Sequence, residues 1–327
     1  MVRTERGDLM VSRRRAVLAL GASVFGAPLG VSAQQHRKVW RIGLLVATTR
    51  EKSDTLSMRS FREGLRELGY IEGRNLTIDW RFADDVDARL SELAAELVKL
   101  QVDVIVTYTP SGVRAAQRAT KTIPIVAMTV GDPVASGFAA SLSHPGGNIT
   151  GSSTMWYETT VKRLELLPSV LPKSARIAYL ANPDAGYTRT NWMGMLVVRA
   201  RTMDDVATGI SLMIKQSAEG LLVADDGYFN FHAREIGELV TRHKLPSTFG
   251  EQDGADGGGL MSYGVDYEDL LHRAATYVDK ILKGQMPGDI PFEQPSKFRF
   301  VINLKTAKAL GITIPPSTLL LASRVIE

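Results

Sequence analysis

The stretch IPIVAMTVGDPVASGFAASLSHPGGNITG, residues 123–151, decides how the rest of the chain is interpreted. It opens with an apolar run from Ile123 to Val130, which is typical of a strand buried on both faces of a parallel sheet. Gly131-Asp132-Pro133 should end that strand, because Gly accepts positive φ and Pro has no N–H for a sheet. A short helical piece is expected over 135–142, before Pro and Gly loosen the chain at 145–147. This stretch therefore holds both a candidate ligand loop and a candidate crossing between domains.

The chain on either side repeats a pattern of strand followed by helix. Apolar runs at 41–47 (RIGLLVA) and 102–107 (VDVIVT) predict buried strands, and residues 75–82 alternate at period two, as a strand does. Amphipathic segments lie between them, so the first half predicts a doubly wound α/β domain. Arg176–Ala181, RIAYLA, mirrors RIGLLVA and indicates that the pattern starts again in a second α/β lobe.

The N-terminus has the composition of a secretion signal. Arg13-Arg14-Arg15 form a basic region, residues 16–29 are apolar, and Val31-Ser32-Ala33 resemble a cleavage site. The three arginines fit either a twin-arginine (Tat) signal or an ordinary Sec signal. Residues 1–33 contain five arginines against Glu5 and Asp8, so they hold +3 of the net charge of +4. The remainder has no basic stripe for binding nucleic acid.

The absence of cysteine excludes structural disulfides, cysteine-based metal sites and a lipid anchor on cysteine. No segment after residue 33 is apolar for the roughly 20 residues that a membrane-spanning helix requires. We therefore expect the mature protein to be free in the periplasm, without a cofactor, and monomeric.

The second lobe is predicted to be shorter than the first. In the first lobe, residues 48–75 separate the first two strands, whereas only residues 182–195 separate RIAYLA from the next apolar run at 196–198. Those 14 residues barely suffice for a parallel crossover, and they include Pro183, Gly186 and Gly194. Two explanations stay open: a naturally compact variant, or a deletion that leaves apolar surface poorly covered and reduces stability.

Three crossings between the lobes are expected, near residues 149–151, 260–264 and 290–297. The predicted domains are a signal peptide at 1–33, a first lobe at 39–148 with 262–289, and a second lobe at 149–261 with 296–327. Three crossings form a hinge, which suits closure of two lobes around a small solute.

Candidate site residues follow the predicted strands. In the first lobe these are Thr48, then Tyr108, Thr109 and Ser111, then Asp132; in the second they are Asn182, Asp225 and Glu251. The carboxyl ends of parallel strands form the ligand-binding edge of open α/β sheets. Helix N-termini at that edge favour an anionic group.

Several long motifs resemble one family. Besides residues 123–151, these are GLMSYG at 259–264, RAATYVDKILKG at 273–284 and FVINLKTAKALGITIPPSTLLLASRVIE at 300–327. Together they resemble the ABC-transporter substrate-binding proteins with a type 1 periplasmic-binding fold, of the tryptophan and amino-acid receptor kind. The resemblance covers roughly residues 39 to 327 and implies two doubly wound α/β lobes joined by three crossing segments, a Venus flytrap. It also implies an ABC importer permease of the inner membrane as partner.

The ligand expected from this resemblance is an amino acid or related carboxylate. Thr48, Thr109, Ser111 and the amides near Asp132 would hold its anionic end. An amino group would meet Asp225 or Glu251. Apolar or stacking walls would come from Tyr108, Trp156 and Tyr263.

Motifs of catalysis are absent: the chain has no G-x-S-x-G, H-E-x-x-H, P-loop or G-x-G-x-x-G, and its five histidines show no metal-ligand spacing. We therefore expect a receptor and not an enzyme. The alternatives are a sensory protein that reports its ligand to a membrane kinase or chemoreceptor, and a degraded paralogue that no longer binds.

Overall fold

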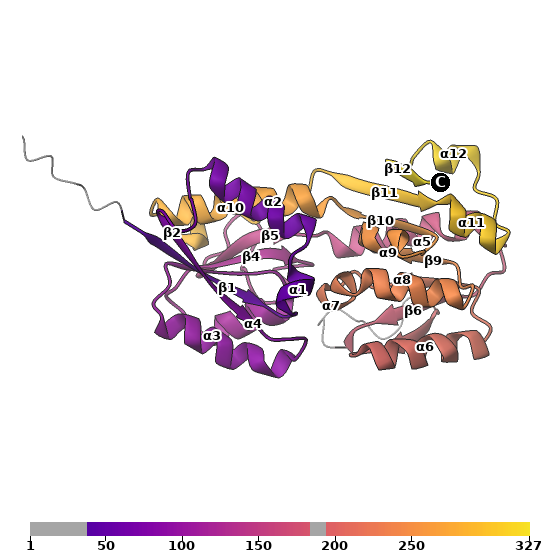
Figure 1. Ribbon diagram of the computed structural model, residues 1–327, viewed down its shortest axis with the longest axis horizontal. Helices are drawn as coiled ribbons and strands as arrows, with labels where there is room; N and C mark the ends of the chain where they lie inside the picture. The colour runs from indigo at the N-terminus through magenta and orange to yellow at the C-terminus, as the bar shows by residue number, and fades with distance from the viewer. Residues whose placement is uncertain (1–37, 184–193) are drawn as a thin grey trace, which may run out of the picture. The chain divides into compact units, whose positions relative to one another are not determined.

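A computed structural model describes residues 38–183 and 194–327, so the predicted signal peptide and Gly186 lie outside the described residues. Residues 38–327 form one compact unit that contains two α/β lobes (Figure 1). We use "first lobe" for the elements packed on the five-stranded sheet and "second lobe" for those packed on the seven-stranded sheet.

The first sheet has the order β2-β1-β3-β4-β5, and all its neighbours are parallel. Its strands are β1 (Trp40–Val46), β2 (Leu76–Phe82), β3 (Val104–Thr107), β4 (Ile125–Val130) and β5 (Ile149–Ser153). Its helices are α1 (Arg50–Ser53), α2 (Leu56–Glu67), α3 (Leu90–Lys99), α4 (Pro110–Ala119) and α10 (Tyr267–Leu282), with the 3₁₀ turns η1 (Asp87–Arg89) and η4 (Pro287–Asp289).

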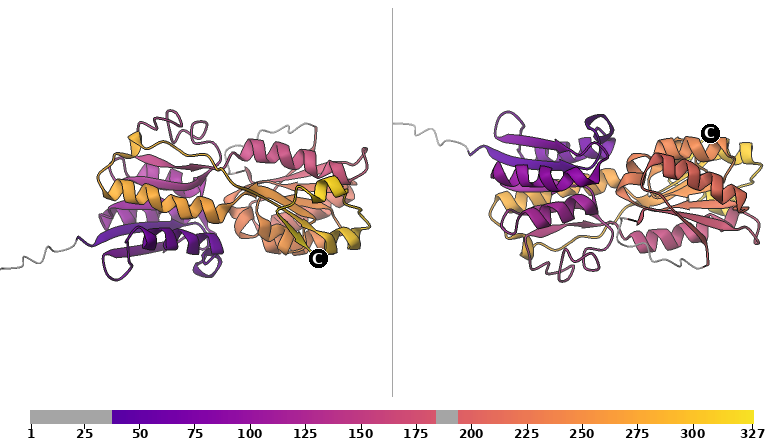
Figure 2. Two further views of the ribbon diagram at one scale, coloured as in Figure 1. Left: turned by 90° about the horizontal axis from the view of Figure 1, so that it is seen from above. Right: turned by 90° about the horizontal axis from the view of Figure 1, so that it is seen from below.

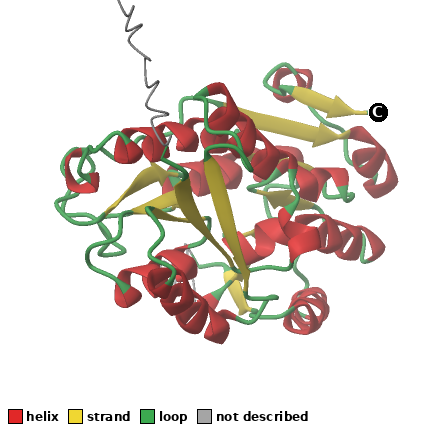
Figure 3. Ribbon diagram, turned by 60° about the vertical axis from the view of Figure 1, so that its left-hand side comes forward, coloured by secondary structure: helices red, strands yellow, loops and turns green. Residues whose placement is uncertain are grey.

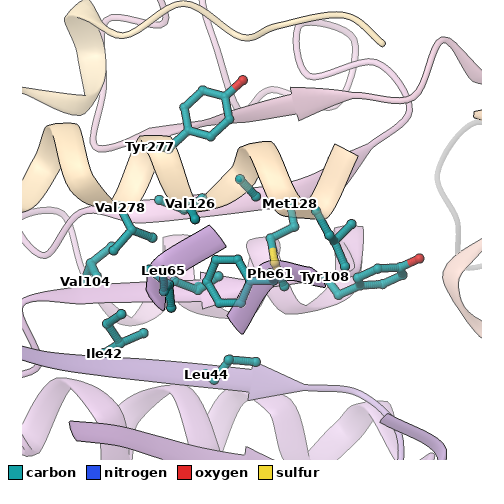
Figure 4. Packing of buried hydrophobic residues seen from close by; sticks show 14 of the residues in the cluster. Ile42, Leu44, Phe61, Leu65, Val104, Tyr108, Val126, Met128, Tyr277 and Val278 are labelled. Carbon is teal, nitrogen blue, oxygen red and sulfur yellow. The ribbon is translucent and has the colours of Figure 1, made fainter. Parts of the chain in front are cut away.

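Two apolar cores cover the two faces of this sheet. On one face, Phe61 and Leu65 of α2 pack with Val278 of α10 against Ile42 and the neighbouring strands (Figure 4). On the other face, α3 and α4 pack with Leu45 and Ile105 of the sheet. Figure 2 shows α10, in orange, among the indigo and magenta elements of the first lobe. A helix from late in the sequence therefore completes a core that begins at β1.

The second sheet has the order β12-β11-β10-β9-β8-β6-β7, in which only β10 and β11 are antiparallel neighbours. The strands are β6 (Ile177–Ala181), β7 (Leu196–Arg199), β8 (Gly220–Val223), β9 (Ser247–Phe249), β10 (Met261–Val265), β11 (Phe298–Asn303) and β12 (Arg324–Ile326). Its helices are α5 (Trp156–Leu166), α6 (Met203–Lys215), α7 (Gly227–Phe231), α8 (Ala233–Arg242), α9 (Gln252–Asp256), α11 (Leu304–Leu310) and α12 (Pro316–Leu319), with the 3₁₀ turn η2 (Pro168–Val170). Figure 3 shows β11 and β12 close to the C-terminus.

Two of the expected crossings belong to strands of a sheet. Ile149–Ser153 is fully buried and pairs with β4, so the chain leaves the first sheet only after Ser153. Residues 260–264 were expected to enter the first lobe, but Met261–Val265 pairs with β9 and β11 of the second sheet. The third crossing runs beside the first, since Ser153 N–H donates to Glu293 O over 2.9 Å. The lobe boundaries proposed from the sequence stay a proposal, and these pairings favour moving them to follow Ser153 and Val265.

The prediction of a short helix at 135–142 is wrong. The Asp132 carboxylate accepts the N–H groups of Val134 and Ala135, each over 2.9 Å, and holds a turn there instead. Gly137 then takes φ of 72°, which a helix does not permit.

The short crossover of the second lobe joins two parallel neighbours, β6 and β7. Residues 184–193 of this crossover lie outside the described residues, so the choice between a compact variant and a deletion stays open. Strand β7 has four residues and lies at the edge of its sheet, whereas the corresponding β2 has seven. Leu164, Ile177, Met195 and Leu196 line a hollow of about 600 Å³ beside this edge.

Candidate functional site

The carboxyl ends of strands from both sheets meet at a cavity of about 230 Å³. Thr48 follows β1, Thr109 follows β3, Asn182 follows β6 and Asp226 follows β8. The described lining consists of Ala47, Thr48, Asp85, Asp87, Thr109, Pro110 and Ser111 from the first lobe and Asn182, Arg201, Thr202, Asp226, Gly227, Tyr228 and Phe231 from the second. The cavity thus lies at the sheet edges where α/β proteins bind ligands.

The wall from the first lobe suits an anionic group. Thr109 caps α4, a helix of ten residues, by accepting the N–H of Gly112 over 3.2 Å, and its hydroxyl lies 3.1 Å from that of Ser111. Thr48 is 1% exposed, and its hydroxyl has no hydrogen-bond partner among the described residues. A buried hydroxyl without a partner costs free energy in the empty protein. A ligand oxygen beside this hydroxyl and the positive end of α4 would remove that cost.

The wall from the second lobe presents a buried carboxyl group. Asp226 caps α7 by accepting the N–H groups of Tyr228 and Phe229, at 2.9 and 3.3 Å. The amide of Asn182 also donates to its Oδ1, over 3.1 Å. Burial raises the pKa of Asp226 to about 6, against the lowering effect of these hydrogen bonds. The hydrogen bonds of the protein therefore compensate the charge of this carboxylate only in part.

Other charges on the lining are unevenly divided. Asp85 and Asp87 of the first lobe add two carboxylates, while Arg201 adds one guanidinium group. Asp87 contributes to the raised pKa of Asp226 through like-charge repulsion. A cationic group in the cavity would relieve this repulsion.

Two aromatic side chains, Tyr228 and Phe231, complete the lining. The Phe231 ring packs on Tyr108, with ring centroids 5.2 Å apart, and Tyr108 packs in turn near Tyr267 at 6.3 Å. Tyr108 is buried in the core of the first lobe (Figure 4) and is not among the residues that line the cavity. It therefore supports an aromatic wall and does not line the cavity itself.

Of the residues predicted for the site, the structure brings Thr48, Thr109, Ser111 and Asn182 together at this cavity. Asp225 lies behind it, where its Oδ1 accepts from the Tyr267 hydroxyl over 2.7 Å and from Asn230 over 2.9 Å. This contact joins the second lobe to α10.

The remaining predicted residues lie elsewhere. Glu251 caps α9 and lines a small separate hollow near Arg299, and burial raises its pKa. Tyr263 stacks on Phe298 across β10 and β11, with ring centroids 6.0 Å apart. Asp132 and Trp156 line another hollow, of about 340 Å³, at the first crossing.

Sequence reasoning did not select Asp85, Asp87, Arg201, Tyr228 and Phe231 as site residues. Asp85 lies three residues after the predicted strand 75–82, so the rule that found Thr48 could also have found this residue. Tyr228 and Phe231 reach the cavity from the helix after β8, for which the strand-end rule gives no signal.

Two negative findings concern residues 38–183 and 194–327. In these ranges, no group of three or more His, Cys, Asp or Glu residues is placed to hold a metal ion. No helix there has the length and apolar composition to cross a membrane.

Comparison with known proteins finds a family and several relatives. The family described as ABC transporter substrate binding protein matches residues 49–326. A tyrosine-binding protein of Clostridioides difficile (strain R20291) is 28% identical over 265 residues, which is 78% of this chain and 76% of the relative. A conserved domain protein of Vibrio cholerae is 26% identical, with a TM-score of 0.80 over 88% of this chain and all of that chain. An ABC domain from Streptococcus pneumoniae in complex with L-Trp is 24% identical, covers 88% and 99%, and shares the fold with a TM-score of 0.77.

Proposed function

Because this chain belongs to the ABC transporter substrate-binding protein family, we propose that it is the periplasmic receptor of an importer. It binds a small solute, an amino acid or related carboxylate, between its lobes and delivers it to a permease in the inner membrane. Closure of the two lobes over the solute signals that the receptor is loaded.

The observation that supports this proposal is that groups suited to an anion and groups suited to a cation face the same cavity from different lobes. The α4 N-terminus and the buried Thr48 hydroxyl face the cavity from the first lobe, and the buried Asp226 carboxyl group faces it from the second. A zwitterion satisfies both walls at once, with its carboxylate at Thr48, Thr109 and Ser111 and its ammonium group at Asp226. The amino-group role predicted for Asp225 or Glu251 is therefore assigned to Asp226 in this proposal.

The side chain of the solute is proposed to be aromatic. Tyr228 and Phe231 supply flat apolar surface on the lining, and aromatic rings favour offset or edge contacts with such surfaces. The names of two relatives, a tyrosine-binding protein and an L-Trp complex, support the same class of solute.

The test is a calorimetric and thermal-shift screen of residues 34–327 against L-tyrosine, L-tryptophan and L-phenylalanine. Phenethylamine and 3-phenylpropionate, which lack the carboxylate or the amino group, are matched comparisons. We expect an amino acid to raise the melting temperature, since a ligand that binds only the native state stabilises it, and both analogues to bind at least tenfold more weakly. If 3-phenylpropionate bound as tightly as the amino acid, Asp226 would not hold an ammonium group. If no amino acid bound, the proposal would be overturned.

The Thr48→Val variant tests the anionic wall. Removing an unpartnered buried hydroxyl should leave the free energy of unfolding of the empty protein unchanged or about 1 kcal/mol higher, and weaken ligand binding by about tenfold. Thr248→Val is the matched control, because the Thr248 hydroxyl is also buried and without a partner among the described residues but lies in β9, away from the cavity. The assignment fails if the two variants bind the ligand equally well.

A further inference from the structure

A cluster of four side chains joins the lobes beside the cavity, and its centre is Lys52. This lysine lies on α1, the helix that begins directly after the cavity residue Thr48 and the cap Thr49. The lysine itself does not line the cavity. Its Nζ lies 3.2 Å from Asp85 Oδ2 of its own lobe. The same atom lies 3.4 Å from both ring nitrogens of His232 and 3.8 Å from Glu235 Oε1, which belong to the second lobe. One ammonium group thus reaches across the cleft.

The part of the cluster on the second lobe is anchored by one buried side chain, that of His232. His232 is 3% exposed, and its Nδ1 lies 3.1 Å from Glu235 Oε2. Its Nε2 lies 3.8 Å from Asp85 Oδ2, which makes a second contact between the lobes. The position of the imidazole is therefore fixed by groups from both lobes.

The cluster is also in direct contact with the lining. The rings of His232 and Tyr228 have centroids 4.4 Å apart, and Tyr228 lines the cavity. Asp85, the partner of Lys52, lines it as well. A solute packed on Tyr228 therefore presses on the ring that Lys52 contacts.

We propose that Lys52, Asp85, His232 and Glu235 form a clasp that holds the two lobes together over a bound solute. Lys52 is the positioning residue of this clasp: it acts through Asp85 and His232 and does not touch the solute. The proposal rests on the proposed function for the identity of the solute, but the contacts between the lobes are independent of it. Because the clasp is built on charge pairs with partial exposure, its strength falls with ionic strength.

The kinetic signature of a clasp differs from that of a ligand contact. A group that holds the closed state slows release of the solute and leaves its rate of entry nearly unchanged. Partly exposed ion pairs contribute up to about 1 kcal/mol, so loss of the pairs should raise the dissociation rate about fivefold. The variants are Lys52→Met, Glu235→Gln and the double variant.

Stopped-flow displacement of L-tyrosine measures the first consequence. We expect each single variant to release L-tyrosine about threefold to fivefold faster, and the double variant to add little to Lys52→Met. Lys162→Met is the matched control, because Lys162 makes a 2.9 Å pair with Glu165 within α5 of the second lobe. Release rates that do not differ between these variants and the control would overturn the clasp.

A second measurement does not require the solute. The chain has no cysteine, so Arg118→Cys on α4 and Lys215→Cys on α6 give two exposed labelling positions, one on each lobe. Energy transfer between attached dyes should show a smaller fraction of closed molecules in ligand-free Lys52→Met than in the parent. In the parent, 1 M NaCl should lower the fraction of closed molecules to the level of Lys52→Met. The clasp is refuted if the distribution of energy-transfer values is the same at every salt concentration and the same in both single variants as in the parent. If none of the three amino acids binds the parent, the proposed function fails, while this measurement still decides the clasp; thermal melts confirm that every variant is folded.

Discussion

The carboxyl group of Asp226 combines two requirements that oppose each other. The proposed function requires it to meet a ligand at the cavity, and it is buried where ionisation is unfavourable. The two N–H groups of α7 and the Asn182 amide offset part of this penalty. The result is a carboxyl group that titrates near pH 6 in the empty protein.

This titration predicts a specific dependence of stability on pH. Because the folded-state pKa is raised from 3.8 to about 6, the folded state holds this proton more tightly than the unfolded chain does. The stabilisation by Asp226 is therefore complete below pH 4 and is lost as the pH rises through 6, with an upper limit of about 3 kcal/mol. Urea unfolding of the ligand-free protein between pH 4 and 8 measures the effect.

Asp226→Asn is the matched variant, since asparagine also caps helices. We expect it to be more stable than the parent at pH 7.5, by about 1–3 kcal/mol, and equal to it near pH 4. In the parent, affinity for an amino acid should rise with pH through 6 as the carboxylate forms. A stability difference between parent and variant that is constant over this pH range would contradict the prediction.

The sequence identified part of the cavity lining because of a simple rule. Thr48, Thr109 and Asn182 follow apolar strands, and parallel strands end at one edge. The rule could not separate Asp225 from Asp226, since adjacent carboxylates share the same strand end, and only the packing shows that Asp225 faces Tyr267. Tyr263 and Trp156 were named for their rings, but the local pattern does not reveal which core an aromatic residue joins.

Helices α2 and α10 pack unusually closely at one glycine. A Cβ built on Gly64 would lie 2.5 Å from the carbonyl oxygen of His272 and 3.0 Å from the Ala275 side chain. Backbone atoms cannot move aside as a flexible side chain can. Gly64 therefore sets the distance between two helices that are some 200 residues apart in the sequence.

The Gly64→Ala variant should be destabilised despite the better helix propensity of alanine. Propensity alone predicts a gain of up to about 1 kcal/mol, whereas overpacking costs about 1–3 kcal/mol, so we expect a net loss. Ser60→Ala in the same helix should change stability by less than about 0.5 kcal/mol, because its hydroxyl bonds only within the helix. Chemical denaturation of both variants provides the comparison, and a stabilised Gly64→Ala would show that the helices separate without cost.

Local patterns predicted several strands of this chain, including β3 at Val104–Thr107 and β6 at Ile177–Ala181. Local patterns failed where the neighbouring strand decides which sheet a segment joins. Met261–Val265 is as apolar as a strand of either sheet, and its pairing with β9 and β11 depends on contacts distant in sequence. Residues 135–142 were mistaken for a helix because the small residues in this stretch satisfy either a helix or a series of turns.

Neither lobe is formed from one continuous segment. The first lobe takes α10 and Ile290 from the far end of the chain, and the buried side chains of α10 include Leu270, Leu271 and Val278. Side chains of this size contribute about 1.5–3 kcal/mol each when fully buried. Their combined contribution is on the order of the whole stability of a domain, 5–15 kcal/mol.

A fragment of residues 38–155 should therefore not fold cooperatively. We expect a second fragment, in which residues 266–292 are joined to it by a Gly–Ser linker, to show a single thermal transition. Circular dichroism during heating distinguishes the two fragments. A cooperative transition in residues 38–155 alone would show that α2 and the sheet suffice without α10.

The late origin of α10 also matters while the protein is being made. Residues 156–265 lie between the last strand of the first sheet and this helix, and at roughly 10 residues per second their synthesis lasts about 10 s. Throughout that interval the growing chain exposes the apolar sheet face that α10 will later cover. We therefore expect the nascent first lobe to be a substrate for holding chaperones, and a pause in translation before α10 to prolong its exposure to aggregation.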